Sequence, residues 1–129
     1  MLTVTPYYAA ALGLLFGVLS LRVIVVRRSK NIGFGAADDA DLERRIRVHA
    51  NFAEYVPMTL LLLGMAEVRG APHLWLHIFN TALLLGRVVH AIGVSQPATD
   101  NIGRVIGMTG TQSALLGGAL LCVLAKAAA

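Results

Sequence analysis

The sequence predicts an all-α protein, an integral membrane four-helix bundle. The first observation is composition: 57% of the 129 residues are hydrophobic, 14% are charged and the mean hydropathy is +0.70, too apolar for an ordinary soluble domain. The second is four segments of about twenty residues or more, the length that crosses a hydrocarbon core. The third is an uneven distribution of basic residues around them. We predict one domain over residues 1–129, with helices at about 7–26, 42–67, 73–94 and 102–126.

The first segment, 7–26, is predicted to remain as a helix. A signal peptide has its positive charge before a shorter apolar core and a small-residue cleavage site after it. Here only Arg22 interrupts the apolar run, and Arg27, Arg28 and Lys30 follow it. Residues 31–41 (NIGFGAADDAD) combine glycines with acids and lack periodicity, which indicates a linker.

The remaining helices are bounded by local signals. Asp41 and Glu43 suit the first turn of the second helix, where carboxylates interact favourably with the helix dipole. Residues 70–72 (GAP) predict a short turn before the third helix. Residues 95–101, which contain Pro97, predict a second turn before the fourth.

The basic residues predict the orientation in the membrane. One side carries only Arg69 and Lys126, whereas the side with the 31–41 linker carries Arg22, Arg27, Arg28, Lys30, Arg44, Arg45, Arg47, Arg87 and Arg104. By the positive-inside rule we expect both termini of this multi-pass protein on the non-cytoplasmic side. As a separate expectation, we place the protein in a bacterial inner membrane. The net charge of +4 does not indicate a nucleic-acid partner, because the basic residues adjoin apolar segments and have few interleaved aromatics.

The second helix has a polar face within an otherwise apolar environment. At 100° per residue, four of its side chains fall within an arc of roughly 80°: Arg44, Arg47, Asn51 and Glu54. An ionised side chain inside a spanning helix costs about 2.5 to 3.5 kcal/mol, so such residues pair or face a cavity. Arg47 is seven residues from Glu54, too far for a direct pair along the helix. The spacing therefore predicts a pocket completed by other helices or by a ligand.

Polar residues of all four helices converge at the predicted cytoplasmic end. The candidate site comprises Arg22, Arg47, Asn51, Glu54, Arg87, His90 and Arg104. Arginines with one carboxylate, one amide and one histidine suit a small polyanion with a single amine, because guanidinium groups bind carboxylates bidentately. Glutathione is such a molecule. A structural polar network between subunits is the alternative interpretation.

These residues resemble a known family. The run RIRVHANFAEYVP, residues 45–57, is similar to the signature of the MAPEG proteins, the membrane-associated proteins in eicosanoid and glutathione metabolism. The family includes microsomal glutathione transferase, prostaglandin E synthase and a leukotriene-forming synthase. Residues 86–90 (GRVVH) resemble the third helix of the prostaglandin synthase, and the resemblance extends over nearly the whole chain.

The resemblance implies a homotrimer that binds glutathione between neighbouring subunits near the cytoplasmic face. A lipophilic co-substrate would arrive from the bilayer. Carried over by position, the glutathione-binding residues would be Arg22, Arg47, Asn51, Glu54, Arg87 and His90. Arg104 matches the arginine that stabilises the thiolate. Val94 and Val105 depart from the tyrosine and serine of eicosanoid-forming members, which argues against eicosanoid substrates.

We therefore predict a glutathione-dependent membrane transferase or peroxidase that acts on lipophilic electrophiles. A thiol with a pKa of about 8.5 becomes a good nucleophile when a nearby cation favours its ionised form, and Arg104 is the candidate cation. The alternatives are a non-catalytic lipid- or glutathione-binding protein of the same fold and, less favoured, a small transporter. The physiological electrophile and the identity of the thiol remain open.

The other histidines are not expected to join this site. His73 and His77 are four residues apart but have no evident third ligand, so we predict interfacial or subunit contacts and no metal site. His49 lies about 160° from Asn51 around the second helix. We expect it to contact another subunit or lipid headgroups.

Overall fold

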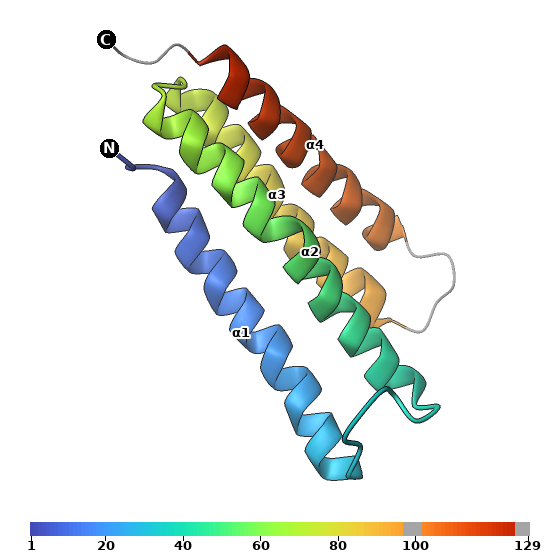
Figure 1. The fold of residues 1–129 in the computed structure, drawn as a ribbon. Coiled ribbons are helices and arrows are strands. Elements are labelled where there is room, and N and C mark those ends of the chain that lie inside the picture. Colours follow the sequence, from blue (N-terminus) through green and yellow to red (C-terminus); the bar gives the residue numbers. More distant parts are fainter. Residues whose placement is uncertain (97–101, 126–129) are drawn as a thin grey trace.

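The described residues form four α-helices, each antiparallel to the one before it in the chain (Figure 1). The computed structural model describes residues 1–96 and 102–125. The helices are α1, Thr5–Lys30; α2, Ala40–Val68; α3, His73–Ser95; and α4, Ile102–Leu124. The described residues contain no strand, so the predicted all-α class is confirmed.

The bundle has two ends that differ in chemistry. At one, here the loop end, residues 31–39 join α1 to α2; α3 finishes and α4 begins there too. At the other, here the terminal end, lie the N-terminus and the short turn between α2 and α3 (Figure 1). Of the predicted second turn, Ser95 belongs to α3, while Pro97 lies outside the described residues, as does Lys126.

The first two helices are longer than predicted at the loop end. α1 includes Lys30 and stops at Asn31, whose φ of 53° is left-handed. α2 begins at Ala40 because Asp39 caps it: its Oδ1 accepts hydrogen bonds from the amides of Asp41 (3.0 Å) and Leu42 (3.1 Å). The Lys30 ammonium and the Leu42 amide hold the pKa of the Asp39 carboxyl below its ordinary value. One carboxylate thus joins both helix ends.

Glycines bring α3 and α4 into the most extensive helix contact. A Cβ added at Gly86 would lie 2.9 Å from the Gly107 carbonyl oxygen, and one at Gly107 would lie 2.6 Å from the Gly86 oxygen and from the His90 Cβ. No side chain fits there, because the neighbouring atoms are mostly backbone. The beginning of α4 therefore lies directly against His90.

α1 packs against α2 and α3 but, within the described residues, not against α4. Its buried apolar side chains recur every seven residues, at Leu12, Leu19 and Val26. At the terminal end the buried carboxylate of Glu67 accepts hydrogen bonds from the amides of residues 3–5, at 2.6 Å from Val4 and 2.8 Å from Thr5. These amides have no partners within the helix, so α2 caps α1.

His49 also joins α1 to α2, which corrects one expectation. Its Nε2 lies 2.9 Å from the Ser20 hydroxyl, and its ring stacks on Phe16 with centroids 4.7 Å apart. The side chain does point away from the polar face of α2. Its partners, however, lie on α1 of the same chain rather than on another subunit, because α1 covers that face.

Three helices are long and apolar enough to cross a membrane: α1, α3 and α4. α2 does not meet this criterion among the described helices, because polar and charged side chains are spread along it from Asp41 to Glu67. Large apolar side chains point outward on all four helices, as expected of a surface in contact with lipid. The predicted membrane-protein class is confirmed.

Candidate functional site

A polar pocket of about 470 Å³ opens at the loop end between α2, α3 and α4. Five of the seven side chains predicted to form the site line it: Arg47, Asn51, Glu54, His90 and Arg104. The remaining lining residues are Ala40, Glu43, Arg44, Ala50 and Val94. Residues from three helices thus line one pocket.

α2 supplies most of the charge in the polar pocket. Arg47, Asn51 and Glu54 are spaced by three or four residues, so they follow one face of the helix. In the part of the chain that the structure describes, ion pairs join Lys30 to Asp39 and both Arg44 and Arg45 to Asp41. None involves Arg47, Glu54 or Arg104, so these charges remain available to a ligand.

His90 and Arg104 reach the pocket through the glycine contact between α3 and α4. His90 is buried, with 5% of its surface exposed, whereas Arg104 is exposed. Arg104 lies three residues before Gly107, one helical turn from the point where α4 meets His90. The close approach of two backbones therefore brings a cation of α4 beside the polar face of α2.

Arg87 lies behind the pocket. Its side chain is 1% exposed, its Nη1 donates to Asn51 Oδ1 at 2.7 Å, and its Nη2 donates to the Met108 sulfur at 3.3 Å. It does not line the polar pocket. Arg87 therefore does not reach the predicted site directly: it contacts Asn51, and Asn51 lines the pocket.

Arg22 lies apart from the other predicted site residues. Its Nη2 donates to the Ser95 hydroxyl at 3.2 Å, and its carbonyl oxygen accepts from Arg45 at 3.5 Å. These contacts tie α1 to the end of α3 and the start of α2. Arg22 lines neither the polar pocket nor the groove beside it.

A groove of about 570 Å³ continues from the polar pocket along α4, here the α4 groove. The two cavities share Asn51, His90 and Arg104. The α4 groove is otherwise lined by Val105, Met108, Thr109, Gln112, Ser113 and Leu116. Three of these are polar side chains at helical spacing within an apolar helix, a signal in the sequence that was not used to predict the site.

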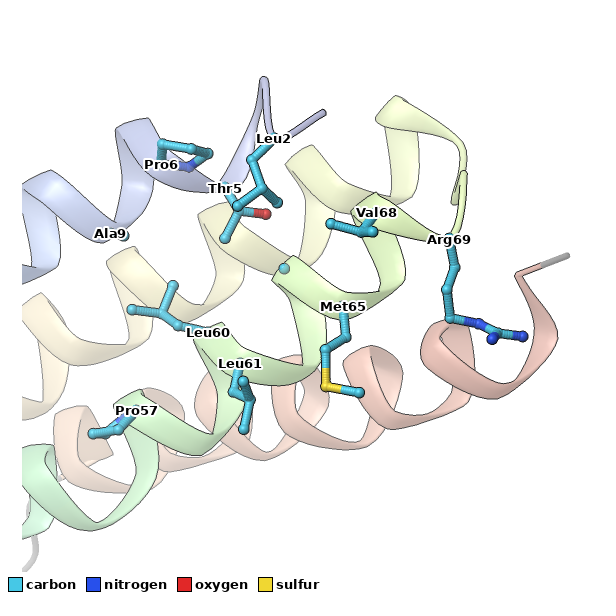
Figure 2. A pocket seen from close by; sticks show the side chains of 11 residues that line it. Leu2, Thr5, Pro6, Ala9, Pro57, Leu60, Leu61, Met65, Val68 and Arg69 are labelled. Carbon is cyan, nitrogen blue, oxygen red and sulfur yellow. The ribbon is translucent and has the colours of Figure 1, made fainter. Parts of the chain in front are cut away.

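A cavity of about 960 Å³ lies between α1 and α2 toward the terminal end (Figure 2). Its lining is almost entirely apolar, with side chains such as Pro6, Leu60 and Met65. Its one charged residue, Arg69, donates to the Ala125 carbonyl at 2.8 Å and so caps the end of α4. A surface of this kind suits hydrocarbon, and its polar side chains are limited to Thr5 and Arg69.

A bundle with membrane-length apolar helices and a cationic pocket at one end defines a multi-helix membrane protein with a polar pocket. The MAPEG family model matches residues 5–124, and the chain belongs to this family. It is 32% identical over 113 residues to the "Inner membrane protein YecN" of Escherichia coli strain K12. The aligned region covers 88% of this chain and 85% of that protein. The protein of the same name in Escherichia coli O6:H1 matches equally well. No solved structure matches the chain.

Proposed function

We propose that the protein is a glutathione-dependent membrane transferase or peroxidase that acts on lipophilic electrophiles. The observation that carries the proposal is the polar pocket, which is lined by Arg47 and Glu54 of α2 and by Arg104 of α4. None of these three side chains forms an ion pair with another described residue. Unpaired charges held at the edge of an apolar bundle are costly, and a ligand of complementary charge would offset that cost.

Glutathione matches the pocket in charge and in chemistry. Four arginines and two glutamates line or adjoin the pocket, an excess of two positive charges: Arg44, Arg47, Arg87, Arg104, Glu43 and Glu54. Glutathione with an ionised thiol carries two carboxylates, one thiolate and one ammonium, an excess of two negative charges. The guanidinium groups that line the pocket would bind the carboxylates, and Glu54 would bind the ammonium.

Arg104 is the proposed catalytic residue. A cation beside the thiol favours the thiolate, and lowering a thiol pKa by two units requires about 2.7 kcal/mol of preferential stabilisation. Arg104 lines both the polar pocket and the α4 groove, so a thiolate beside it would face the groove. In transfer, the sulfur would form a bond to an electrophilic carbon while the leaving group departs with its electron pair.

The α4 groove is the proposed site of the lipophilic electrophile. Apolar side chains such as Val105 and Leu116 would contact its hydrocarbon part, while Gln112 and Ser113 offer hydrogen bonds to a polar group. Gln112 and Ser113 are at least partly exposed on α4, the helix that α1 does not cover. A substrate dissolved in the bilayer would therefore reach Arg104 without leaving the membrane.

We further infer that the chain assembles as a homotrimer, with both termini on the non-cytoplasmic side and with α2 as a fourth span. Family membership and the name of the Escherichia coli relative support an inner-membrane location. α2 has 29 residues and lies between α1 and α4, antiparallel to α1 and parallel to α4, so its apolar second half would cross the membrane with them. The excess of basic residues at the loop end supports its placement in the cytoplasm.

The test combines binding and turnover on the purified protein. Glutathione at 100 times its dissociation constant should add about 2.7 kcal/mol to the stability of the folded state, and S-methylglutathione should bind without reacting. Conjugation of glutathione to a generic aryl halide, and reduction of a lipid hydroperoxide, are then measured. Binding without either reaction would favour the non-catalytic alternative. No stabilisation by glutathione, with stabilisation by another thiol, would overturn the choice of co-substrate.

A further inference from the structure

Arg87 is the most buried ionisable side chain among the described residues, yet it has no carboxylate partner there. Its described partners are the Asn51 amide oxygen and the Met108 sulfur, and its Nε has none. A buried cation with such weak partners adds little to stability, since apolar replacements of buried charged groups are often neutral or stabilising. Its contact with Asn51 therefore requires another explanation.

Hydrogen-bond chemistry fixes what Asn51 presents to the pocket. Arginine has donors and no acceptor, so the Asn51 atom 2.7 Å from Arg87 Nη1 must be the amide oxygen. The amide nitrogen is then the atom left for the pocket, and no described residue accepts a hydrogen bond from it. Asn51 lines both the polar pocket and the α4 groove, so this donor is placed where the two meet.

We propose that Arg87 is a positioning residue: it holds the Asn51 amide so that the site offers an N–H donor and selects a carboxylate oxygen of the ligand. The inference rests on the proposed glutathione site and specifies one contact within it. Arg87 itself does not touch the ligand, because it is 1% exposed and does not line the pocket. An unheld amide could turn either atom toward the ligand and would lose this selectivity.

A double-mutant cycle separates this indirect role from direct contact. Arg87→Met removes the donor with little change of shape, and we expect it to weaken glutathione binding about tenfold in the otherwise unchanged protein. In an Asn51→Ala background the same change should have almost no effect on binding. Arg45→Met is the control, because Arg45 pairs with Asp41 and lines neither cavity. An undiminished loss in the Asn51→Ala background would overturn the proposal.

Asn51→Asp tests the selectivity. The aspartate still accepts from Arg87 but presents an oxygen to the ligand, so glutathione should bind at least a hundredfold more weakly. The two glutathione monoamides, each with one carboxylate replaced by a carboxamide, serve as matched ligands. One monoamide should bind the original protein poorly. The same monoamide should bind the Asn51→Asp variant more tightly than glutathione binds that variant. The same preference for glutathione in both proteins would overturn the assignment.

Melting without ligand distinguishes this inference from the proposed function. The changes at Arg87 and Asn51 should be non-additive in melting temperature if their hydrogen bond forms. Non-additive melting in a protein that binds neither glutathione nor its amides would refute the proposed function and, with it, the selectivity. Additive melting together with normal glutathione binding would refute only the positioning role.

Discussion

Arg104 occupies the junction of the polar pocket and the α4 groove, which makes its removal informative. We expect Arg104→Leu to retain most of the glutathione affinity, since Arg47, Asn51 and Glu54 remain, and to slow conjugation by about 10² to 10³. The ultraviolet absorbance of the bound thiolate, followed across pH, should show the thiol reverting toward its solution pKa. Arg28→Leu is the control because Arg28 is exposed and lines neither cavity. A full thiolate signal in the Arg104 variant would contradict the assignment.

Opposite faces of α2 predict opposite consequences of substitution. Arg47→Ala and Glu54→Gln should each weaken glutathione binding by about ten- to hundredfold, because each removes a charge-assisted contact. His49→Ala should leave binding nearly unchanged and lower stability by about 1 kcal/mol, because it removes the contacts with Ser20 and Phe16. Calorimetry and thermal melting measure the two effects. Equal losses of binding at His49 and Glu54 would show that the helical phase is wrong.

At the scale of elements, Asp39 makes the junction of α1 and α2 sensitive to acid. Its pKa is lowered in the folded protein by Lys30 and by the Leu42 amide. Its contribution to stability is therefore complete above the ordinary carboxyl pKa and is lost as the pH falls through the lowered one. Melting temperatures between neutral and strongly acidic pH should decline less in Asp39→Asn, since asparagine caps a helix about as well but does not titrate. An identical decline would place the acid sensitivity elsewhere.

The contact between α3 and α4 depends on the absence of a side chain at Gly107. Gly107→Ala would place a Cβ 2.6 Å from the Gly86 oxygen and the His90 Cβ, so the helices must separate. We expect a loss of about 1 to 3 kcal/mol in stability and weaker glutathione binding, because His90 and Arg104 move apart. Gly13→Ala is the matched control: nothing lies within 4 Å of its added Cβ, and it should change neither property. Thermal melting and calorimetry on both variants test the difference.

For the whole molecule, the proposed assembly predicts a mass. Native mass spectrometry of the protein released from detergent should give three times the mass of the 13.7 kDa chain. Apolar side chains exposed on α1 and α4 leave ample surface for subunit contacts and for lipid. A monomer that still binds glutathione would show that one chain completes the site, and would refute a site shared between subunits.

Properties that belong to one segment were predictable from the sequence. The membrane class follows from apolar length, and the polar face of α2 follows from the helical period, since both depend only on nearby residues. The convergence of Arg47, Asn51, Glu54, His90 and Arg104 required only that antiparallel helices place their matching ends together. The helix ends were less predictable, because caps such as Asp39 extend a helix beyond its apolar run.

The tertiary structure decided what each side chain touches once the helices are placed and rotated against one another. It put Arg87 behind Asn51, turned Arg22 toward Ser95 and used Glu67 to cap a helix more than sixty residues away in the chain. These outcomes depend on interhelical distances, which between α3 and α4 are set by the backbone contact of their glycines. Sequence spacing describes one helix at a time. Whether an arginine lines a pocket or supports it from behind is settled only by the rotation of the helix against its neighbours.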